Sequence, residues 1–216
     1  IGAYAAALEW LKAMGLVYRC WCTRSEIAEV LKHKPVRHGP DGPVYPGTCR
    51  GRRDGQGDFC WRLDMAAAVA RTGPLGWTDL VAGPQQTDPM QFGDVILWRK
   101  DAPASYHLAA TLDDAADGIS HVVRGLDLFA YTTIHRILQA LLGLAQPLYW
   151  HHPLLLDEKG EKLAKSRLSQ PLAELRAEGI SGIALVQQLR QGQLPLGRRR
   201  GGRVRGQGGR SGSDGG

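Results

Sequence analysis

The stretch that decides the fold is Ile119-Ser120-His121-Val122-Val123-Arg124, which ends at Gly125 and precedes a helical pattern over residues 128 to 142. Its β-branched side chains are typical of a buried parallel strand. In the helical segment the apolar residues recur at intervals of three and four, and Gly143 provides a C-terminal stop. Strands alternating with helices predict an α/β sheet, with Arg124 at the carboxyl end of its strand, where such sheets bind ligands.

Segments on both sides of this unit carry similar signals. Residues 3 to 16 have apolar side chains at intervals of three and four, and they predict a helix that ends at Gly15. Thr23 and Glu26 fit a capping box, so a second helix is expected from there to about Lys32. We expect a helix or strand at residues 106 to 112, and strands at residues 16 to 22, 60 to 63, 75 to 81, 92 to 99, 119 to 124 and 153 to 156.

Composition and charge narrow the class of protein. The apolar content of 43% is enough for a core, and no apolar run reaches the roughly 18 residues of a membrane span. We see no signal peptide and therefore expect a cytoplasmic protein without a membrane segment. Of the net charge of +6, +5 lies in residues 198 to 216, which hold six Arg and one Asp, so the rest of the chain is near +1. That balance is atypical of a general binder of nucleic acid.

Four cysteines indicate a metal site rather than disulfides, because the sequence shows no secretion signal. Cys20, Cys22 and Cys49 are the firm candidates for a zinc site. Residues 33 to 57 are too polar to order themselves without a clamp such as a bound metal, and Cys20 and Cys49 bracket much of this polar segment. The alternative is that these cysteines are simply buried. Tyrosine is a rare ligand, so chemistry alone favours a cysteine or a histidine when the fourth ligand is chosen from Tyr45, Cys60, His33 and His38.

A pair of lysines follows the turn at residues 157 to 160, in the segment Lys162-Leu163-Ala164-Lys165-Ser166. Two ammonium groups three residues apart on a loop can close over a triphosphate and neutralise charge that develops on it. The segment is not a P-loop, because no G-x-x-x-x-G-K-[ST] pattern is present. Without further context, a solvated charged turn is the better interpretation of these lysines.

The order of motifs over about residues 3 to 170 supplies that context. His121-Val122-Val123-Arg124-Gly125-Leu126-Asp127-Leu128 is followed by a helix, by Tyr149-x-His151-x-Pro153 and by Leu156-Asp157-x-x-Gly160-x-Lys162-Leu163-x-Lys165. This series resembles class I aminoacyl-tRNA synthetases of the glutamyl type. The same family has counterparts of Ser105 to Ala109, Asp113-Asp114, Cys20-x-Cys22-Thr23-Arg24 and Tyr45-x-x-x-Cys49. The resemblance implies an α/β fold with the C-terminal part of a Rossmann-like parallel sheet, and an inserted zinc-binding subdomain.

Within this group the chain resembles most the short glutamyl-queuosine tRNA(Asp) synthetases. The Cys-x-Cys and Tyr-x-x-x-Cys pattern favours them over full glutamyl-tRNA synthetases, as does the lack of a helical anticodon domain after the lysine pair. The resemblance implies that L-glutamate is activated with ATP and Mg²⁺ and transferred to the queuosine of tRNA(Asp), by a protein expected to be a monomer. Two alternatives stay open, a truncated discriminating glutamyl-tRNA synthetase and a non-catalytic, zinc-bearing RNA-binding remnant.

The resemblance also assigns roles to residues. It implies one structural zinc ion per chain on Cys20, Cys22, Tyr45 and Cys49, which selects Tyr45 over Cys60 as the fourth ligand. It implies glutamate contacts at Tyr106 and Arg124. It further implies that Lys162 and Lys165 are catalytic and that Lys165 binds ATP. Ala164 departs from the family, which usually has a serine at that place.

The family's first ATP motif, a Pro-x-x-x-Gly-x-x-His-x-Gly loop, does not occur in these 216 residues. We therefore expect Ile1 to be a cut end and the chain to be inactive alone. The expected organisation has five parts, namely the end of the first catalytic half (1–19), the zinc-binding insertion (20–60), the second catalytic half with the lysine loop (61–170), a short helical segment (171–197) and a disordered Arg/Gly-rich tail (198–216).

Overall fold

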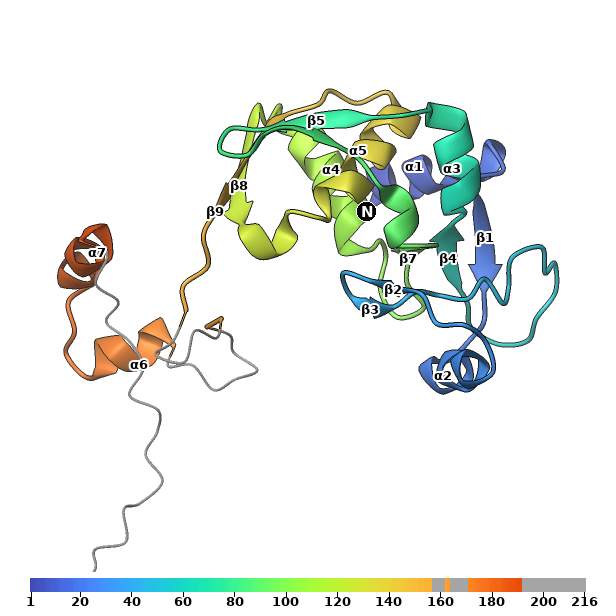
Figure 1. Ribbon diagram of the computed structural model, residues 1–216, viewed down its shortest axis with the longest axis horizontal. Helices are drawn as coiled ribbons and strands as arrows, with labels where there is room; N and C mark the ends of the chain where they lie inside the picture. Colours follow the sequence, from blue (N-terminus) through green and yellow to red (C-terminus); the bar gives the residue numbers. More distant parts are fainter. Residues whose placement is uncertain (157–161, 164–170, 192–216) are drawn as a thin grey trace, which may run out of the picture. The chain divides into compact units, whose positions relative to one another are not determined.

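The computed structural model describes residues 1–156, 162–163 and 171–191, and the chain divides into two units, residues 1–152 and 153–216. In the first unit, helices α4 and α5 lie between the four-stranded sheet, which contains β5, and helices α1 and α3 (Figure 1). In the second unit, the described helices are α6 (Leu172–Ala177) and α7 (Gly182–Arg190). The predicted Lys165 and the Arg/Gly-rich tail lie outside the described residues.

The larger sheet of the first unit has four strands in the order β6-β5-β9-β8. Strands β5, β9 and β8 run parallel to one another, whereas β6 is antiparallel to β5. The predicted α/β class is confirmed, although the sheet is mixed rather than wholly parallel. The register places Arg124 of β8 opposite His151 of β9. The four strands are β5 (Gly76–Asp79), β6 (Gly83–Gln86), β8 (His121–Gly125) and β9 (Leu148–His152).

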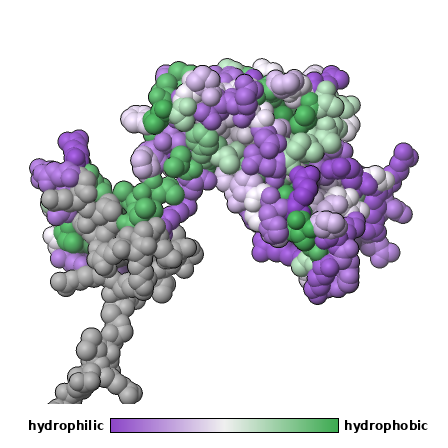
Figure 2. All heavy atoms as spheres, viewed as in Figure 1, coloured by the Kyte–Doolittle hydropathy of each residue, from purple (hydrophilic) through white to green (hydrophobic). Residues whose placement is uncertain are grey.

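Two predictions about this sheet need correction. The stretch that ends at Arg124 does form a parallel strand, but it is not buried, because β8 is an edge strand and 59% of Val123 is exposed. Among the described residues, the strand that follows α5 is β9, and the predicted strand at residues 153 to 156 does not form. In β9, the buried Tyr149 and His151 alternate with exposed neighbours such as Trp150, as expected for a strand. The apolar residues that follow gave a stronger strand signal than this alternation. Apolar residues gather at the surface over β8 and β9 (Figure 2).

The second sheet is antiparallel, in the order β1-β4-β7. Strand β4 (Cys60–Leu63) has the predicted bounds, and it pairs with β1 (Val17–Cys20) and β7 (Ile96–Trp98). The β1–β4 register places Cys20 directly opposite Cys60. This sheet therefore carries two of the four cysteines on neighbouring strands.

The main core surrounds α5 (Thr132–Leu142), whose Ile134, Ile137 and Leu138 are at most 1% exposed. The predicted start at residue 128 is too early, because the chain forms a 3-10 turn, η2 (Leu126–Leu128), before the helix. Gly143 caps the helix in the left-handed conformation (φ 66°), as the sequence indicated. The other helices that pack in this core are α1 (Gly2–Ala13), α3 (Met65–Thr72) and α4 (Tyr106–Ala116).

Helix α2 (Arg24–Lys32) and a small hairpin cover the cysteine-bearing end of the first unit, where polar residues dominate the surface (Figures 1 and 2). The predicted capping box is present, because the Thr23 side chain accepts a hydrogen bond from the Glu26 N–H while Glu26 accepts one from the Thr23 N–H. The remaining elements are β2 (His38–Gly39), β3 (Gly42–Pro43) and η1 (Pro89–Gln91). No helix among the described residues has the length and apolarity to cross a membrane.

Candidate functional site

Arg124, near the carboxyl end of β8, is held by three side chains. Its Nε donates to Nε2 of His151 (3.0 Å), its Nη2 donates to Oγ1 of Thr132 (2.6 Å), and its Nη1 lies 3.2 Å from Nδ1 of His135. The contacts come from β9 and from successive turns of α5. Because a guanidinium carries five N–H groups, three are used within the described residues and two remain for a ligand.

His151 is in turn fixed by Asp79, which is the last residue of β5 and is only 1% exposed. Oδ2 of Asp79 lies 2.8 Å from Nδ1 of His151 and accepts the His151 backbone N–H at 3.1 Å. Oδ1 of Asp79 accepts the N–H groups of Val81 and Ala82. Both carboxylate oxygens therefore have hydrogen-bond partners. This residue could not be identified from the sequence, because a single aspartate at a strand end carries no motif.

Tyr106 reaches the same site through a histidine pair. Its ring centroid lies 5.7 Å from that of His135, and His107 Nδ1 lies 3.3 Å from His135 Nε2. Tyr106 is 55% exposed at the start of α4, so a ligand can reach this residue. The predicted glutamate contacts, Tyr106 and Arg124, are thus linked by one buried imidazole ring.

The histidines of this site are neutral at physiological pH. Burial, with a smaller contribution from the positive charge of Arg124, lowers the pKa of His107 to about 4 and holds the pKa of His135 well below its usual value. Burial also lowers the pKa of His151, although Asp79 opposes the change. Burial would raise the pKa of Asp79, but its backbone N–H and His151 hydrogen bonds outweigh burial and lower it. The site therefore combines a fixed cation with neutral imidazoles.

A second site gathers the cysteines predicted for zinc. The Sγ atoms of Cys20, Cys22 and Cys49 all lie within 4.8 Å of one another, and Cys20 and Cys49 are fully buried. The Tyr45 hydroxyl oxygen lies 3.3 Å from Sγ of Cys20 and 3.8 Å from Sγ of Cys22, and it accepts the Cys49 N–H at 2.9 Å. The predicted set of four is thus brought together, and its thiol-rich donors fit zinc or another thiophilic ion.

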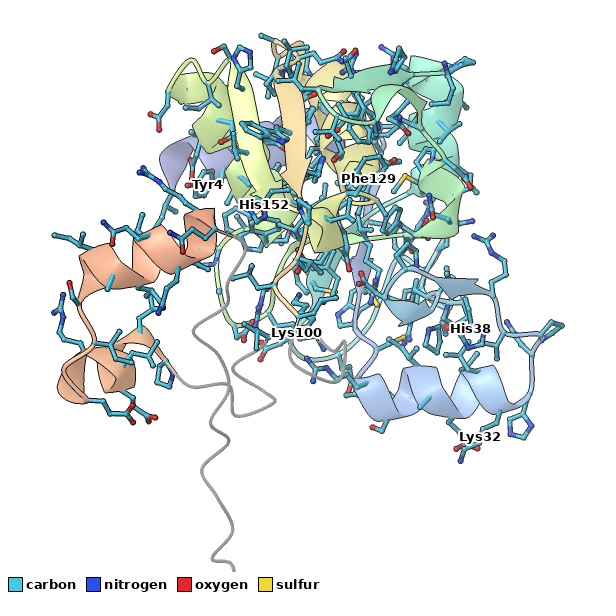
Figure 3. All side chains as sticks on the ribbon, turned by 60° about the vertical axis from the view of Figure 1, so that its left-hand side comes forward. Tyr4, Lys32, His38, Lys100, Phe129 and His152 are labelled. Carbon is cyan, nitrogen blue, oxygen red and sulfur yellow. The ribbon has the colours of Figure 1, made fainter. Side chains whose placement is uncertain are left out.

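The other residues considered for the fourth place are outside this set of close donors, although Cys60 is hydrogen-bonded to one member of it, Cys20. Cys60 faces Cys20 across the strand pair but is outside the set of three mutually close cysteines. His33 is exposed, and its Nε2 lies 3.3 Å from Oε1 of Glu29. His38 is exposed on the hairpin strand β2 (Figure 3). Hydrogen bonding with Cys60 is the main reason that the pKa of Cys20 falls to about 4, which favours the thiolate that a metal needs.

Asp94 ties the cysteine-bearing segment to the core. Its side chain is only 1% exposed and accepts hydrogen bonds from the guanidinium of Arg50, from the Tyr18 hydroxyl and from the Met65 N–H. Arg50 directly follows Cys49 in the sequence. Asp94 lies within the strand predicted at residues 92 to 99, but nothing in the sequence reveals that the chain folds back over it.

The lysine loop is described only in part. Lys162 forms a β-bridge with Leu156, and both belong to the second unit. Lys165 lies outside the described residues. The structure therefore brings the predicted metal ligands close to one another, and it brings the two predicted glutamate contacts into one separate site. The roles of all these residues, and of the two lysines, are predictions.

The sheet, the arginine at its edge and the cysteine cluster define a class of protein. The chain belongs to the family of class I tRNA synthetases for E and Q, because the model of that family's catalytic domain matches residues 2–199. The fold agrees with that of the glutamate-tRNA synthetase from Elizabethkingia anophelis, with a TM-score of 0.58 and 18% identity over 76% of this chain and 35% of that chain.

Within this class, the chain is similar to proteins named Glutamyl-Q tRNA(Asp) synthetase. That of Rhodobacter capsulatus is 43% identical over 192 residues, which cover 82% of this chain and 68% of the relative. That of Cupriavidus metallidurans is 42% identical over 185 residues, which cover 82% of this chain and 58% of the relative. The resemblance found in the sequence is confirmed, and the chain spans about three fifths to two thirds of the length of these relatives.

Proposed function

We propose that the full-length protein activates L-glutamate with ATP and Mg²⁺ and transfers the glutamyl group to the queuosine of tRNA(Asp). The observation that carries the proposal is the guanidinium of Arg124, fixed at the carboxyl end of β8 with two N–H groups left over. A planar pair of N–H donors fits the two oxygens of a carboxylate. The family and the named relatives support a glutamyl-tRNA synthetase-like ligase.

In the proposed first step, an oxygen of the glutamate α-carboxylate attacks the α-phosphorus of ATP. A P–O bond forms to the carboxylate while the P–O bond to pyrophosphate breaks, which gives glutamyl-adenylate. Arg124 and the exposed Tyr106 hold glutamate in place, so their contribution is positioning. The resemblance gives Lys162 and Lys165 the task of neutralising charge on the leaving phosphates. In the second step, a hydroxyl of the tRNA attacks the glutamyl carbonyl carbon of the adenylate. An ester bond forms to the tRNA oxygen, the bond to the phosphate oxygen breaks, and AMP leaves.

We propose that Cys20, Cys22, Tyr45 and Cys49 hold one structural zinc ion. The three close sulfur atoms and the nearby hydroxyl of Tyr45 support this donor set. Four protein ligands leave no open position for a substrate, so the ion's contribution is to order the polar segment of residues 33 to 57. The monomeric state and the cytoplasmic location of the protein are parts of the same proposal.

The nature of the acceptor can be tested with three tRNAs, namely tRNA(Asp) with and without queuosine and tRNA(Glu). We expect the full-length protein to transfer labelled glutamate to tRNA(Asp) that carries queuosine, and not to tRNA(Asp) that carries guanosine at that position. A discriminating glutamyl-tRNA synthetase would instead charge tRNA(Glu) and neither form of tRNA(Asp). Binding of tRNA without any ATP-dependent transfer would favour the non-catalytic alternative.

We further propose that these 216 residues do not form glutamyl-adenylate by themselves. The support is the sequence itself, in which the family's first ATP motif does not occur. Glutamate-dependent exchange of pyrophosphate into ATP by the 216-residue chain, at rates similar to those of the full-length protein, would contradict this part of the proposal.

A further inference from the structure

We propose that Asp79 and His151 are positioning residues that aim the guanidinium of Arg124 by fixing the tautomer of the His151 ring. The inference rests on the proposed function, because it concerns the residue assigned to the glutamate carboxylate. It adds two residues from β5 and β9 that act through Arg124 without contacting glutamate themselves.

The first step is the tautomer of His151. Asp79 is an ionised carboxylate and can only accept hydrogen bonds, so the nitrogen that faces it at 2.8 Å, Nδ1, carries the proton. A neutral imidazole has one N–H, which leaves a lone pair on Nε2. That lone pair faces the Nε–H of Arg124 at 3.0 Å and is a suitable acceptor for it. Asp79 therefore determines what His151 offers to Arg124.

The second step is the rigidity of Asp79 itself. Its Oδ1 accepts two backbone N–H groups, from Val81 and Ala82, and its Oδ2 accepts the backbone N–H of His151. These bonds hold the carboxylate against the parallel pair β5–β9, where Asp79 is also the register partner of Tyr149. Hydrogen bonds therefore fix each side chain in the series that runs from the backbone through Asp79 and His151 to Arg124.

The third step is the effect on the guanidinium. Thr132 Oγ1 accepts from Nη2 of Arg124 and lies 3.4 Å from Nε2 of His151, so the two acceptors grip one edge of the guanidinium plane. Nδ1 of His135 accepts from Nη1. Each terminal nitrogen keeps one N–H beyond the contacts within the described residues, and the orientation of the plane fixes where those two groups point.

The alternative tautomer would destroy this arrangement. With the proton on Nε2, the ring would present an N–H to the Nε–H of Arg124, and two donors would face each other at 3.0 Å. The guanidinium would have to rotate away, and the two free N–H groups would move with it. Asp79→Asn should allow this, because a neutral amide can either donate or accept and no longer forces the proton onto Nδ1.

The direct test is nuclear magnetic resonance of the 216-residue chain with ¹⁵N-labelled histidine. At pH 7 we expect wild-type His151 to have its proton on Nδ1, and Asp79→Asn to shift a substantial fraction to Nε2. Asp64→Asn is the matched control, because Asp64 also accepts a backbone N–H, at the start of α3, but contacts no histidine in the described part of the chain. A wild-type proton on Nε2, or no shift in Asp79→Asn, would overturn the proposal.

Kinetics of the full-length protein provide the second arm. In glutamate-dependent pyrophosphate exchange, Asp79→Asn should raise the KM for glutamate by about 10- to 100-fold, with less effect on kcat and on the KM for ATP. His151→Gln keeps an acceptor near Arg124, so it should retain more affinity for glutamate than His151→Leu. An unchanged glutamate KM in Asp79→Asn would refute the proposal, as would equal losses in the two His151 variants.

The two arms separate this inference from the proposed function. If the wild-type full-length protein shows no glutamate-dependent exchange, the proposed function fails, and the aiming of Arg124 at glutamate fails with it. The tautomer of His151 in the 216-residue chain would still report whether Asp79 fixes the ring. If exchange is present while Asp79→Asn changes neither the tautomer nor the KM, only the positioning inference fails.

Discussion

The hydroxyl oxygen of Tyr45 lies 3.3 Å from Sγ of Cys20, although 25 residues separate the two in the sequence. The same oxygen accepts the backbone N–H of Cys49. The contact closes the loop that carries the polar segment between Cys20 and Cys49. It also places the hydroxyl oxygen of Tyr45, as a fourth donor atom, beside the three cysteine sulfur atoms. Tyr45 is therefore the residue whose replacement says most about the proposed metal.

The first prediction concerns that metal. We expect one zinc ion per chain by elemental analysis, its loss in Cys49→Ser, and an affinity at least about 10-fold lower in Tyr45→Phe, because one of four ligands is removed. Cys60→Ser is the matched control and should retain the ion, since Cys60 is outside the group of close sulfur atoms. Retention of zinc in Tyr45→Phe together with its loss in Cys60→Ser would assign the fourth place to Cys60.

The second prediction concerns the buried carboxylate that anchors the same segment. Asp94→Ala should lower the free energy of unfolding by about 3 kcal/mol, because it leaves the Met65 N–H and the Tyr18 hydroxyl without their partner and removes the ion pair with Arg50. Denaturant unfolding monitored by fluorescence measures the change.

An exposed ion pair provides the control for that experiment. Arg99 and Asp101 are 55% and 68% exposed, so Asp101→Ala should leave the free energy of unfolding almost unchanged. Equal effects of the two substitutions would show that Asp94 does not anchor the segment.

The third prediction concerns pH. The pKa of His107 is about 4 in the folded chain, against about 6.5 for an unperturbed histidine, so the unfolded chain binds more protons between these values. Stability should therefore fall on acidification from about pH 6.5 to about pH 4, by at most about 1.4 kcal/mol per pH unit for each such histidine. His107→Gln should make this dependence shallower in urea titrations across the range, and an unchanged dependence in this variant would contradict the prediction.

Much of the fold could be predicted from local patterns. The bounds of β4 and the capping box at Thr23 were right because each depends on neighbouring residues alone. The start of α5 was placed too early because a 3-10 turn has nearly the same spacing of apolar residues. The exposure of β8 could not be predicted, since whether a strand lies at an edge depends on its partners in space.

The candidate sites were predictable to a different degree. Spacing and resemblance identified the cysteines, Tyr45 and Arg124, because these residues lie in recognisable motifs. Asp79 and Asp94 were missed as supporting residues, because each acts on side chains more than 25 residues away. Such contacts form only when the sheets assemble, so no local sequence pattern predicts them.

A fourth prediction addresses the carboxylate contact itself. Arg124→Lys keeps the positive charge but loses the planar pair of donors and the hydrogen bonds to Thr132 and His135. We expect the KM for glutamate in the full-length protein to rise at least about 10-fold, with little change in the KM for ATP. Replacing Arg71, which lies in the last turn of α3, by lysine is the control and should leave both constants unchanged.

The measurement that tests the central claim most directly is glutamate-dependent exchange of labelled pyrophosphate into ATP by the full-length protein, with wild-type and Arg124→Lys compared side by side. The expected result is exchange that requires glutamate, is not supported by aspartate, and needs a much higher glutamate concentration in Arg124→Lys. Exchange that proceeds without glutamate, or that is equally sensitive to glutamate in the two proteins, would contradict the assignment of Arg124 and of the proposed activity to this site.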